Sequence, residues 1–313
     1  MTVRIDVVIP TWNRSDLLGR CLRRLAAQSL PHTVIVVDNG STDGTVELVR
    51  EEFPAVHVVE LNENLGFGPA VNRGVAAGSA PVLVLVNNDV ECDPTFLEGI
   101  VAPFEDDDGV GMVAGLLLRP GRATVDGYGL ELDSTLAAFP RFSGEPYDPE
   151  RLHERNLAAP SGGAAAYRRS AYEAVGGFDE QLFAYMEDVD LALRLHAEGW
   201  RCAGARDAVG EHAGSATAGR RSRTQVEIAG ASRGYMLRKY GILQSGIREA
   251  TAALAAETAA VGAELVLGRD LAALKGRIAG WRRARGQRAQ VPRGAINGSI
   301  GLLGSLRRRR AGL

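Results

Sequence analysis

In the first half of the chain, short continuous apolar runs alternate with segments in which apolar residues recur every three or four positions. The runs predict four strands, at residues 4–9, 33–38, 56–61 and 82–87. The periodic segments predict helices at residues 15–28, 44–53 and 68–78, with Ser15 as the N-cap of the first. Strands that are apolar throughout are typical of parallel strands buried on both faces. This half is therefore predicted to be a doubly wound, mostly parallel α/β layer.

The second half of the chain is less regular. Between residues 109 and 160, short apolar runs mixed with Gly and Pro turns predict a mixed-sheet extension over one edge of the layer. An acidic helix is predicted within 183–200 and a strand at 200–205, and the pattern is helical from Thr224 onward. We therefore expect a main α/β domain at residues 1–241 and a helical tail at residues 242–313.

Charge is distributed unevenly along the chain, although the net charge is only −2. The tail holds 13 Lys and Arg against 4 Asp and Glu, a balance of +9, which leaves −11 for the rest. Apolar residues at spacings of four and three predict one basic amphipathic helix there; they are Leu267, Leu271, Leu274, Ile278 and Trp281. Such a helix favours binding to the anionic surface of a membrane. Packing on the body or on a second copy of the chain is the alternative, which leaves a homodimer open. The tail lacks the aromatic pattern of a nucleic-acid site, so no nucleic acid is expected as a partner.

Cysteine usage and terminal sequence bear on the compartment. Cys21, Cys92 and Cys202 lie far apart without a CxxC pair, so neither a disulfide framework nor a zinc site is expected. The N-terminal MTVRIDVVIP has no basic segment before an apolar stretch, and no apolar run reaches the roughly 18 residues of a spanning helix. These features predict a cytoplasmic protein without a secretory signal.

Polar clusters follow each predicted strand at its carboxyl end. They are PTWNR at 10–14, DNGSTDGT at 38–45, NENLGFG at 62–68 and NNDVECDP at 87–94. Any single cluster has turn formation as an alternative, because Gly, Asn and Asp favour turns. In doubly wound sheets ligands bind beyond the carboxyl ends of the strands, so four clusters on one edge indicate a nucleotide-type pocket.

A group of carboxylates marks the start of the acidic helix. Glu187, Asp188 and Asp190 fall in its first turn, ahead of an apolar helical pattern. The helix dipole stabilises acids at this place by up to about 1 kcal/mol, which is one explanation. The other is catalysis, because a positioned carboxylate can act as a general base.

Taken in order, these motifs resemble family 2 glycosyltransferases. The likeness covers residues 3–217 and is carried by VVIPTWNR, VVDNGSTDGT, LNENLGFGPAVNRG, LVNNDV, GGFDEQLFAYMEDVDLALRL and the later His212. In detail they look most like the bacterial rhamnosyltransferase-type branch, which builds surface polysaccharides and lipid-linked glycans. The resemblance implies a GT-A fold and transfer of a sugar, with inversion, from a nucleotide diphosphate to an acceptor.

The resemblance assigns the donor site to the polar clusters. Asp38 is expected to accept the imide N–H of uracil or thymine, with capping of a turn as the alternative. The other expected nucleotide-sugar contacts are Pro10, Thr11, Asn13, Asn64, Gly66, Asn87, Asn88 and Asp89. Arg14 and Arg73 are candidate neighbours of phosphate or ribose, with plain surface arginines as the equal alternative. Ser161, Gly162 and Gly163 resemble the loop under the donor sugar, where glycine permits close approach of the backbone.

The resemblance also implies a divalent cation, Mg²⁺ or Mn²⁺, at Asp89 and His212. The segment NND stands where the family carries its DxD motif, with Asn87 in place of the first acid, so Asp89 is expected to be the main carboxylate ligand. One or two carboxylates suffice when substrate phosphates complete the shell. An imidazole ligand shifts preference toward Mn²⁺ over Ca²⁺. A turn role for Asp89 with Asp93, and a loop role for His212, are the alternatives.

For the reaction itself, Asp188 matches the family's base and Glu187 becomes a neighbour that binds the acceptor. Asp190 points elsewhere on the helix and is expected to be a capping acid, while Asp179 is expected to hold a sugar hydroxyl. The expected donor is a UDP- or dTDP-sugar, with dTDP-rhamnose favoured. The expected acceptor is a glycan, on a polyprenyl carrier at the inner face of the plasma membrane, where the protein would be peripheral.

Two rival functions are compatible with parts of the sequence. A sugar-phosphate nucleotidyltransferase of the same fold needs a Gly-rich loop straight after the first strand, and PTWNRSD has no glycine. A non-catalytic nucleotide-sugar-binding or scaffold protein would have no need of Asp188, Asp89 and His212 together. The sequence therefore favours a glycosyltransferase over both.

Overall fold

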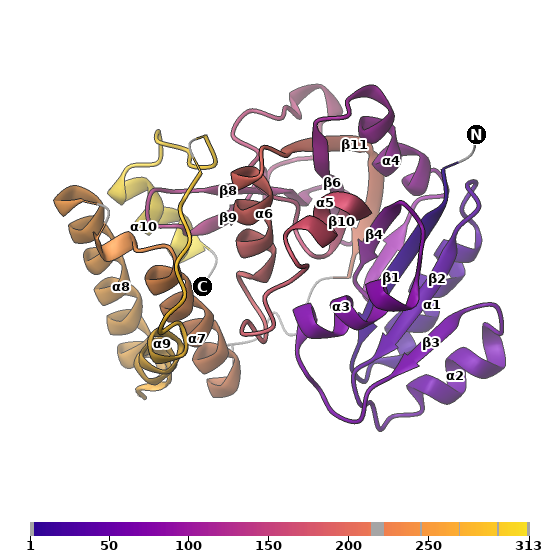
Figure 1. The fold of residues 1–313 in the computed structure, drawn as a ribbon, viewed down its shortest axis with the longest axis horizontal. Coiled ribbons are helices and arrows are strands. Elements are labelled where there is room, and N and C mark those ends of the chain that lie inside the picture. The colour runs from indigo at the N-terminus through magenta and orange to yellow at the C-terminus, as the bar shows by residue number, and fades with distance from the viewer. Residues whose placement is uncertain (1–2, 214–221, 245, 269, 293, 312–313) are drawn as a thin grey trace.

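The architecture is a mixed β-sheet covered by helices, with a helical bundle at one end (Figure 1). It comes from a computed structural model that describes residues 3–213, 222–244, 246–268, 270–292 and 294–311. The sheet order is β3-β2-β1-β4-β10-β6-β11-β5, with β7 paired to β6. Its strands are β1 (Ile5–Thr11), β2 (Thr33–Asp38), β3 (His57–Glu60), β4 (Val82–Val86), β5 (Val90–Cys92), β6 (Val110–Leu118), β7 (Val125–Tyr128), β10 (Ala164–Arg168) and β11 (Arg201–His212).

The four predicted parallel strands are confirmed, and alternate residues face two separate cores. Val7 and Ile9 of β1 face one hydrophobic cluster, while Val8 faces the other. Helices α1 (Ser15–Ala26), α2 (Thr45–Glu52) and α4 (Phe96–Asp106) contribute to the first cluster. Helices α3 (Phe67–Ala77), α5 (Arg169–Ala174) and α6 (Glu187–Ala197) contribute to the second. Burial on both faces explains why these strands read as continuous apolar runs.

Helix α1 begins differently from the prediction. Ser15 is its first residue and not its N-cap, because Arg14 holds the capping position with a left-handed φ of 72°. The Ser15 N–H instead donates to Asp43 Oδ2 at 3.0 Å. The loop after β2 therefore caps the helix that follows β1.

The predicted mixed extension is confirmed. Within the predicted range, β6 pairs antiparallel with β7, and it also pairs antiparallel with β10 and parallel with β11, which come later in the chain. A separate hairpin of β8 (Leu130–Leu132) and β9 (Ala138–Pro140) reaches from this region toward the helical bundle (Figure 1). A short 3₁₀ turn, η1 (Pro149–Arg151), follows the hairpin.

The bundle contains α7 (Arg223–Lys239), η2 (Ile242–Gln244), α8 (Ile247–Gly268), α9 (Ala272–Arg283) and α10 (Leu302–Ala311). The prediction of one amphipathic helix through residues 267–281 is wrong, because α8 ends at Gly268 and α9 starts at Ala272. Helices α7 and α9 approach closely at paired glycines: a Cβ on Gly234 would collide with the Arg277 backbone, and one on Gly280 with that of Ala231. This spacing turns the small-residue face of α9 inward. The side chain of Leu267 lies outside the described part of the structure.

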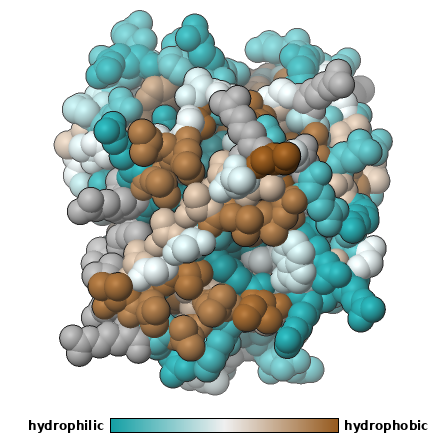
Figure 2. All heavy atoms as spheres, turned by 90° about the vertical axis from the view of Figure 1, so that its left-hand side faces the viewer, coloured by the Kyte–Doolittle hydropathy of each residue, from teal (hydrophilic) through white to brown (hydrophobic). Residues whose placement is uncertain are grey.

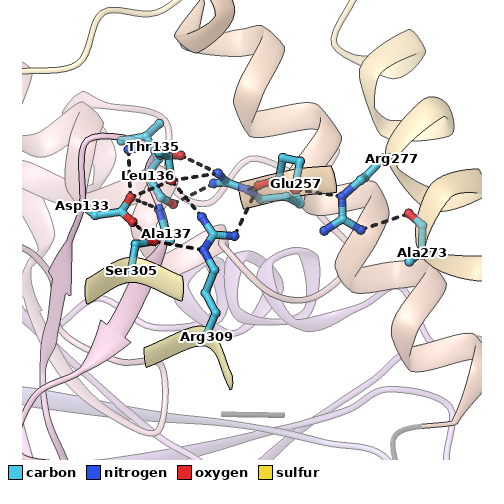
Figure 3. A network of polar contacts seen from close by, with 10 residues as sticks. Asp133, Thr135, Leu136, Ala137, Glu257, Ala273, Arg277, Ser305 and Arg309 are labelled. Atoms are coloured by element: carbon cyan, nitrogen blue, oxygen red, sulfur yellow. Dashed lines mark hydrogen bonds and ion pairs between the residues drawn. The ribbon is translucent and has the colours of Figure 1, made fainter. Parts of the chain in front are cut away.

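A buried ionic network fastens the bundle to the β8–β9 hairpin (Figure 3). Glu257 of α8 accepts from Arg233 Nε and Arg277 Nε, each at 2.8 Å, and from Arg309 Nη1 at 3.3 Å. Arg309 also donates to Thr135 Oγ1 at 2.8 Å in the hairpin loop. Burial alone would raise the pKa of Glu257, but the three guanidinium groups outweigh it and lower the pKa to about 2. The carboxylate thus stays ionised and ties four elements together.

Among the helices that the structure describes, none is long and apolar enough to cross a membrane.

Candidate active site

The polar loops after β1, β2, β3 and β4 meet at one edge of the sheet, as their parallel order requires. Asp38 ends β2 and is buried there. Its Oδ2 accepts the Ser41 N–H at 3.0 Å, while its Oδ1 is buried with no hydrogen-bond partner among the described residues. A buried acceptor without a donor fits the imide N–H of a pyrimidine base.

The loop after β1 is held against the neighbouring loops by side-chain amides. Asn88 Nδ2 donates to Thr11 Oγ1 at 2.8 Å, which joins the ends of β1 and β4. The Asn13 N–H donates to Ser41 Oγ at 2.7 Å, and Asn13 Oδ1 accepts the Thr42 N–H at 3.0 Å. These contacts bring Thr11, Asn13 and Asn88 together beside Asp38. Pro10, at the end of β1, is in register with Val37 of β2.

Asn39 is a residue of this polar edge that sequence reasoning did not single out. Its Nδ2 donates to Asn64 Oδ1 and to the Gly66 carbonyl, both at 3.0 Å, and its Oδ1 accepts the Leu65 N–H at 2.9 Å. Its position inside DNG, directly after Asp38, is the signal that could have found it. Asn64 and Gly66 are therefore locked to the end of β2.

Gly66 links this donor side to the loop before α6. Its φ of 95° is a conformation that favours glycine. There is also no space for a side chain, because an added Cβ would collide with the Phe183 carbonyl oxygen. The next residue, Phe67, donates its N–H to that oxygen at 2.8 Å. The chain then passes through Tyr185 and Met186, both at positive φ, into α6. Two successive non-glycine residues in this region are strained, which is common at functional sites.

Glu187 and Asp188 open α6, and burial acts on both carboxylates. Asp188 Oδ1 accepts the Val189 N–H at 2.8 Å, while Glu187 Oε2 is buried with no hydrogen-bond partner among the described residues. Burial raises the pKa of both groups above their ordinary values, and the charge of Asp188 raises that of Glu187 further. Backbone hydrogen bonds from Val189 and Gly162 oppose this rise at Asp188.

The predicted cation ligands lie together. His212 Nε2 is 3.2 Å from Asp89 Oδ2, and the two are joined through the β5–β11 ladder, in which His212 pairs with Val90. The Ala213 N–H donates to the Asp89 carbonyl at 2.9 Å. Burial alone would lower the pKa of His212, but hydrogen bonds to Asp126 and Asp89 raise it to about 10.

The loop of Ser161, Gly162 and Gly163 connects Asp188 to the edge that holds Asp89 and His212. Gly162 donates its N–H to Asp188, and the carbonyl of the next residue, Gly163, accepts the Asn87 N–H at 3.2 Å. Asn87 lies two residues before Asp89, and Ser161 bridges to Ala164 at the start of β10. The base candidate and the cation candidates are thus joined by a short path of backbone contacts.

Three predicted side chains have partners within the protein. Asp190 is fully buried and ion-paired with Lys239 at 2.6 Å and Arg194 at 2.8 Å, so its expected role as a capping acid is wrong. Asp179 Oδ2 accepts from Lys239 and Tyr235, each at 2.7 Å, and its predicted sugar contact stays a prediction. Arg73 pairs with Glu180 at 2.8 Å.

Arg14 is partly exposed and lies 3.5 Å from Asp16.

Two surface cavities lie away from this edge, one beside Arg4 and Arg169 and the other beside His153 and Asp207. Neither is lined by a predicted site residue.

Asp89 and His212 suit Mg²⁺ or Mn²⁺ in their donor chemistry. Asp89 Oδ1 is buried without a hydrogen-bond partner among the described residues, which leaves a carboxylate oxygen free for a cation. Among the residues that the structure describes, no group of three or more His, Cys, Asp or Glu side chains is arranged to hold a metal ion by itself. A cation here therefore needs substrate oxygens to complete its shell.

The fold and this polar edge define a class, the GT-A-type nucleotide-sugar enzymes. The family model described as glycosyl transferase family 2 matches residues 6–176, and the chain belongs to that family. It is a glycosyltransferase by this membership.

Curated relatives agree with this assignment. The N-acetylglucosaminyl-diphospho-decaprenol L-rhamnosyltransferase of Mycobacterium tuberculosis strain H37Rv is 34% identical over 224 residues, which cover 64% of this chain and 73% of that protein. The O-antigen biosynthesis protein RfbC of Myxococcus xanthus is 32% identical over 218 residues, 64% of this chain but 16% of that protein. The chain thus resembles rhamnosyltransferases, as expected.

Solved structures confirm the GT-A fold. The mannosyltransferase PcManGT from Pyrobaculum calidifontis, in complex with GDP-Man and Mn²⁺, has a TM-score of 0.57 and 22% identity, covering 91% of this chain and 86% of that chain. GalNAc-T7, solved with UDP, GalNAc and Mn²⁺, has a TM-score of 0.59 and 14% identity, covering 78% of this chain and 52% of that chain.

Proposed function

We propose that this chain transfers L-rhamnose, with inversion, from dTDP-rhamnose to N-acetylglucosaminyl-diphospho-polyprenol in a metal-dependent reaction. The observation that carries the proposal is a set of three buried carboxylate oxygens on one rim that have no hydrogen-bond partner among the described residues: Asp38 Oδ1, Asp89 Oδ1 and Glu187 Oε2. In the proposal, Asp38 faces the nucleobase of the donor, Asp89 faces the cation and Glu187 faces a hydroxyl of the acceptor. The likeness to the mycobacterial L-rhamnosyltransferase supports the choice of sugar and of lipid-linked acceptor.

In this proposal each residue has a defined task. Asp38 accepts the imide N–H of thymine, and Thr11, Asn13 and Asn88 line the base and ribose. Asp89 and His212 hold Mn²⁺ or Mg²⁺, which when bound supplies Lewis-acid stabilisation of the departing diphosphate. Asp188 takes the proton of the acceptor hydroxyl as its oxygen attacks the anomeric carbon, and the bond to the diphosphate breaks. Glu187 orients the acceptor.

A thermal-shift screen over UDP- and dTDP-sugars with Mn²⁺ tests the donor. Because a ligand at 100 times its Kd stabilises the folded state by about 2.7 kcal/mol, dTDP-rhamnose should raise Tm by several degrees. Asp38→Asn should abolish most of that shift, because the amide N–H₂ would be a donor facing the imide N–H, which is also a donor. The matched control is Asp16→Asn, an exposed acid near the same loop. No shift with any nucleotide sugar would refute the proposal, and a shift with UDP-sugars alone would overturn the rhamnosyl donor.

We also propose that residues 1–241 catalyse transfer while the tail binds an anionic membrane at the inner leaflet. Helix α9 buries Ala272, Ala273, Gly276 and Gly280 against α7 and leaves Leu271, Leu274 and Ile278 exposed by 45%, 38% and 44%. Figure 2 faces this end of the molecule and shows apolar side chains gathered in a broad band across it. Helix α8 adds exposed Leu265 and Val266.

Charge on the same face supports a lipid surface as the occupant. Leu274, Ile278 and Arg282 follow one another at four-residue spacing and so share one stripe of α9. Lys275, also exposed, falls within the same arc of the helix at 100° per residue, and exposed Arg285 lies in the turn just beyond the helix end. Apolar side chains flanked by cations match an anionic bilayer, and the proposed acceptor is itself anchored in one.

Liposome sedimentation tests the tail. The full chain should bind vesicles rich in anionic lipid and not zwitterionic ones. Lys275→Gln/Arg282→Gln/Arg285→Gln should weaken binding by roughly 100-fold, because each cation near the surface contributes about 1 kcal/mol. Leu271→Gln/Leu274→Gln/Ile278→Gln should weaken it similarly. Unchanged binding by both variants, or a stable dimer that only the second variant dissociates, would overturn the membrane assignment.

A further inference from the structure

His212 lies between two carboxylates from different strands. Its Nε2 faces Asp89 Oδ2 at 3.2 Å, and its Nδ1 lies 2.7 Å from Asp126 Oδ2. Asp126 belongs to β7, which is fixed by pairing with β6, and its other oxygen lies 3.5 Å from Arg119 Nε. Neither the motifs of the family nor the proposed function uses Asp126.

We propose that Asp126 is a positioning residue that prepares His212 to bind the cation. By accepting the Nδ1–H, Asp126 holds the ring so that Nε2, the nitrogen beside Asp89, is the one that gives up its proton and faces the cation. Metal-binding histidines commonly donate their second ring N–H to a carboxylate in this way. The inference rests on the proposed cation site at Asp89 and His212.

The geometry separates this role from direct ligation. The two ring nitrogens of an imidazole point in different directions, and Asp126 lies on the Nδ1 side while Asp89 lies on the Nε2 side. A cation bound by Nε2 and Asp89 would therefore lie on the other side of the ring from Asp126, which would contact only Nδ1. Both His212 and Asp89 are mostly buried, with side chains 19% and 17% exposed, whereas Asp126 is 31% exposed.

Titration of the full chain with Mn²⁺, followed by electron paramagnetic resonance in the presence of dTDP, tests this role. Asp126→Asn should raise the Mn²⁺ dissociation constant about 10- to 100-fold. The matched control is Glu145→Gln, which removes the same charge beside the same strand: the Glu145 carbonyl accepts the Val125 N–H, but its side chain faces Arg151. The control should leave Mn²⁺ affinity unchanged, and each variant should show a cooperative melting transition without metal, which establishes that it is folded.

A double substitution shows whether Asp126 acts through His212. In that case His212→Ala/Asp126→Asn should bind Mn²⁺ as weakly as His212→Ala alone, because the second change has nothing left to orient. Equal affinity of Asp126→Asn and Glu145→Gln, with His212→Ala impaired, would overturn the inference and leave the proposed function intact. An unimpaired His212→Ala would instead overturn the cation site itself, and additive losses would show that Asp126 acts on the cation without His212.

Discussion

Asp188→Asn is expected to abolish sugar transfer while donor binding stays close to that of the unaltered chain. Asn has the same size and its Oδ1 can still accept the Val189 N–H, so the start of α6 should keep its shape. It cannot take a proton from the acceptor hydroxyl. General-base catalysis contributes about 10²- to 10⁴-fold, so kcat should fall by that range. Initial rates of transfer and calorimetric titration with the donor measure the two effects.

Glu187→Gln is the matched control for this prediction. It removes the neighbouring charge from the same helix turn, and its expected effect is mainly a higher KM for the acceptor. Near-normal turnover in Asp188→Asn together with loss in Glu187→Gln would transfer the base role to Glu187.

The pH profile gives a second readout of the same base. Because burial raises the pKa of Asp188, the acid limb of kcat/KM should lie above the ordinary aspartate value of about 4. Below that limb the carboxyl is protonated and cannot accept the proton, so activity falls as pH falls. Asp188→Asn should remove this limb from any residual activity.

Much of the fold was predictable because both faces of its parallel strands are buried. Strands buried on both faces need apolar residues at successive positions, so they are visible in the sequence as apolar runs, such as 33–38 and 82–87. The polar clusters then mark the strand ends. The family resemblance was what paired Asp89 with His212, two residues far apart in sequence, and their side chains lie 3.2 Å apart. Their joint role in holding a cation stays a prediction.

Other features depend on contacts that no local pattern records. Ser15 looks like an N-cap, but the loop from β2 supplies Asp43 and the left-handed Arg14 takes the capping position. Asp190 does lie in the first turn of α6, but its side chain is buried and pairs with Lys239 of α7, a contact that the local sequence does not record. Asp126 is one acid in a short strand, and only the pairing of β7 with β6 brings it to His212.

Lys239→Met is expected to destabilise the protein by about 3 kcal/mol, the lower end of the cost of breaking a buried ion pair. Lys239 Nζ lies 2.6 Å from Asp190 Oδ1 and 2.7 Å from Asp179 Oδ2, with side chains 7%, 0% and 16% exposed respectively. Removing the cation leaves two buried acids short of one partner. Arg194 and Tyr240 still contact Asp190, which keeps the cost from being larger.

The same substitution should also affect catalysis, because Asp190 lies in the first turn of α6 with Asp188. Loss of Lys239 is therefore expected to lower Tm by roughly 5–10 °C and to lower kcat more than donor affinity. Lys275→Met is the matched control, since Lys275 is the other lysine of the chain and is exposed on α9. Chemical denaturation and melting curves of the two variants measure the difference.

The pH dependence of this loss gives the decisive check. Burial alone would raise the pKa of Asp179, but hydrogen bonds from Lys239 and Tyr235 hold it below its usual value. A lowered carboxyl pKa contributes stability that is present above the unfolded-state pKa of about 4 and disappears as pH falls through the folded-state value. The gap in unfolding free energy between Lys239→Met and the unaltered chain should therefore shrink in acid. A gap that is constant with pH, or equal to that of Lys275→Met, would show that Lys239 does not stabilise α6 through these carboxylates.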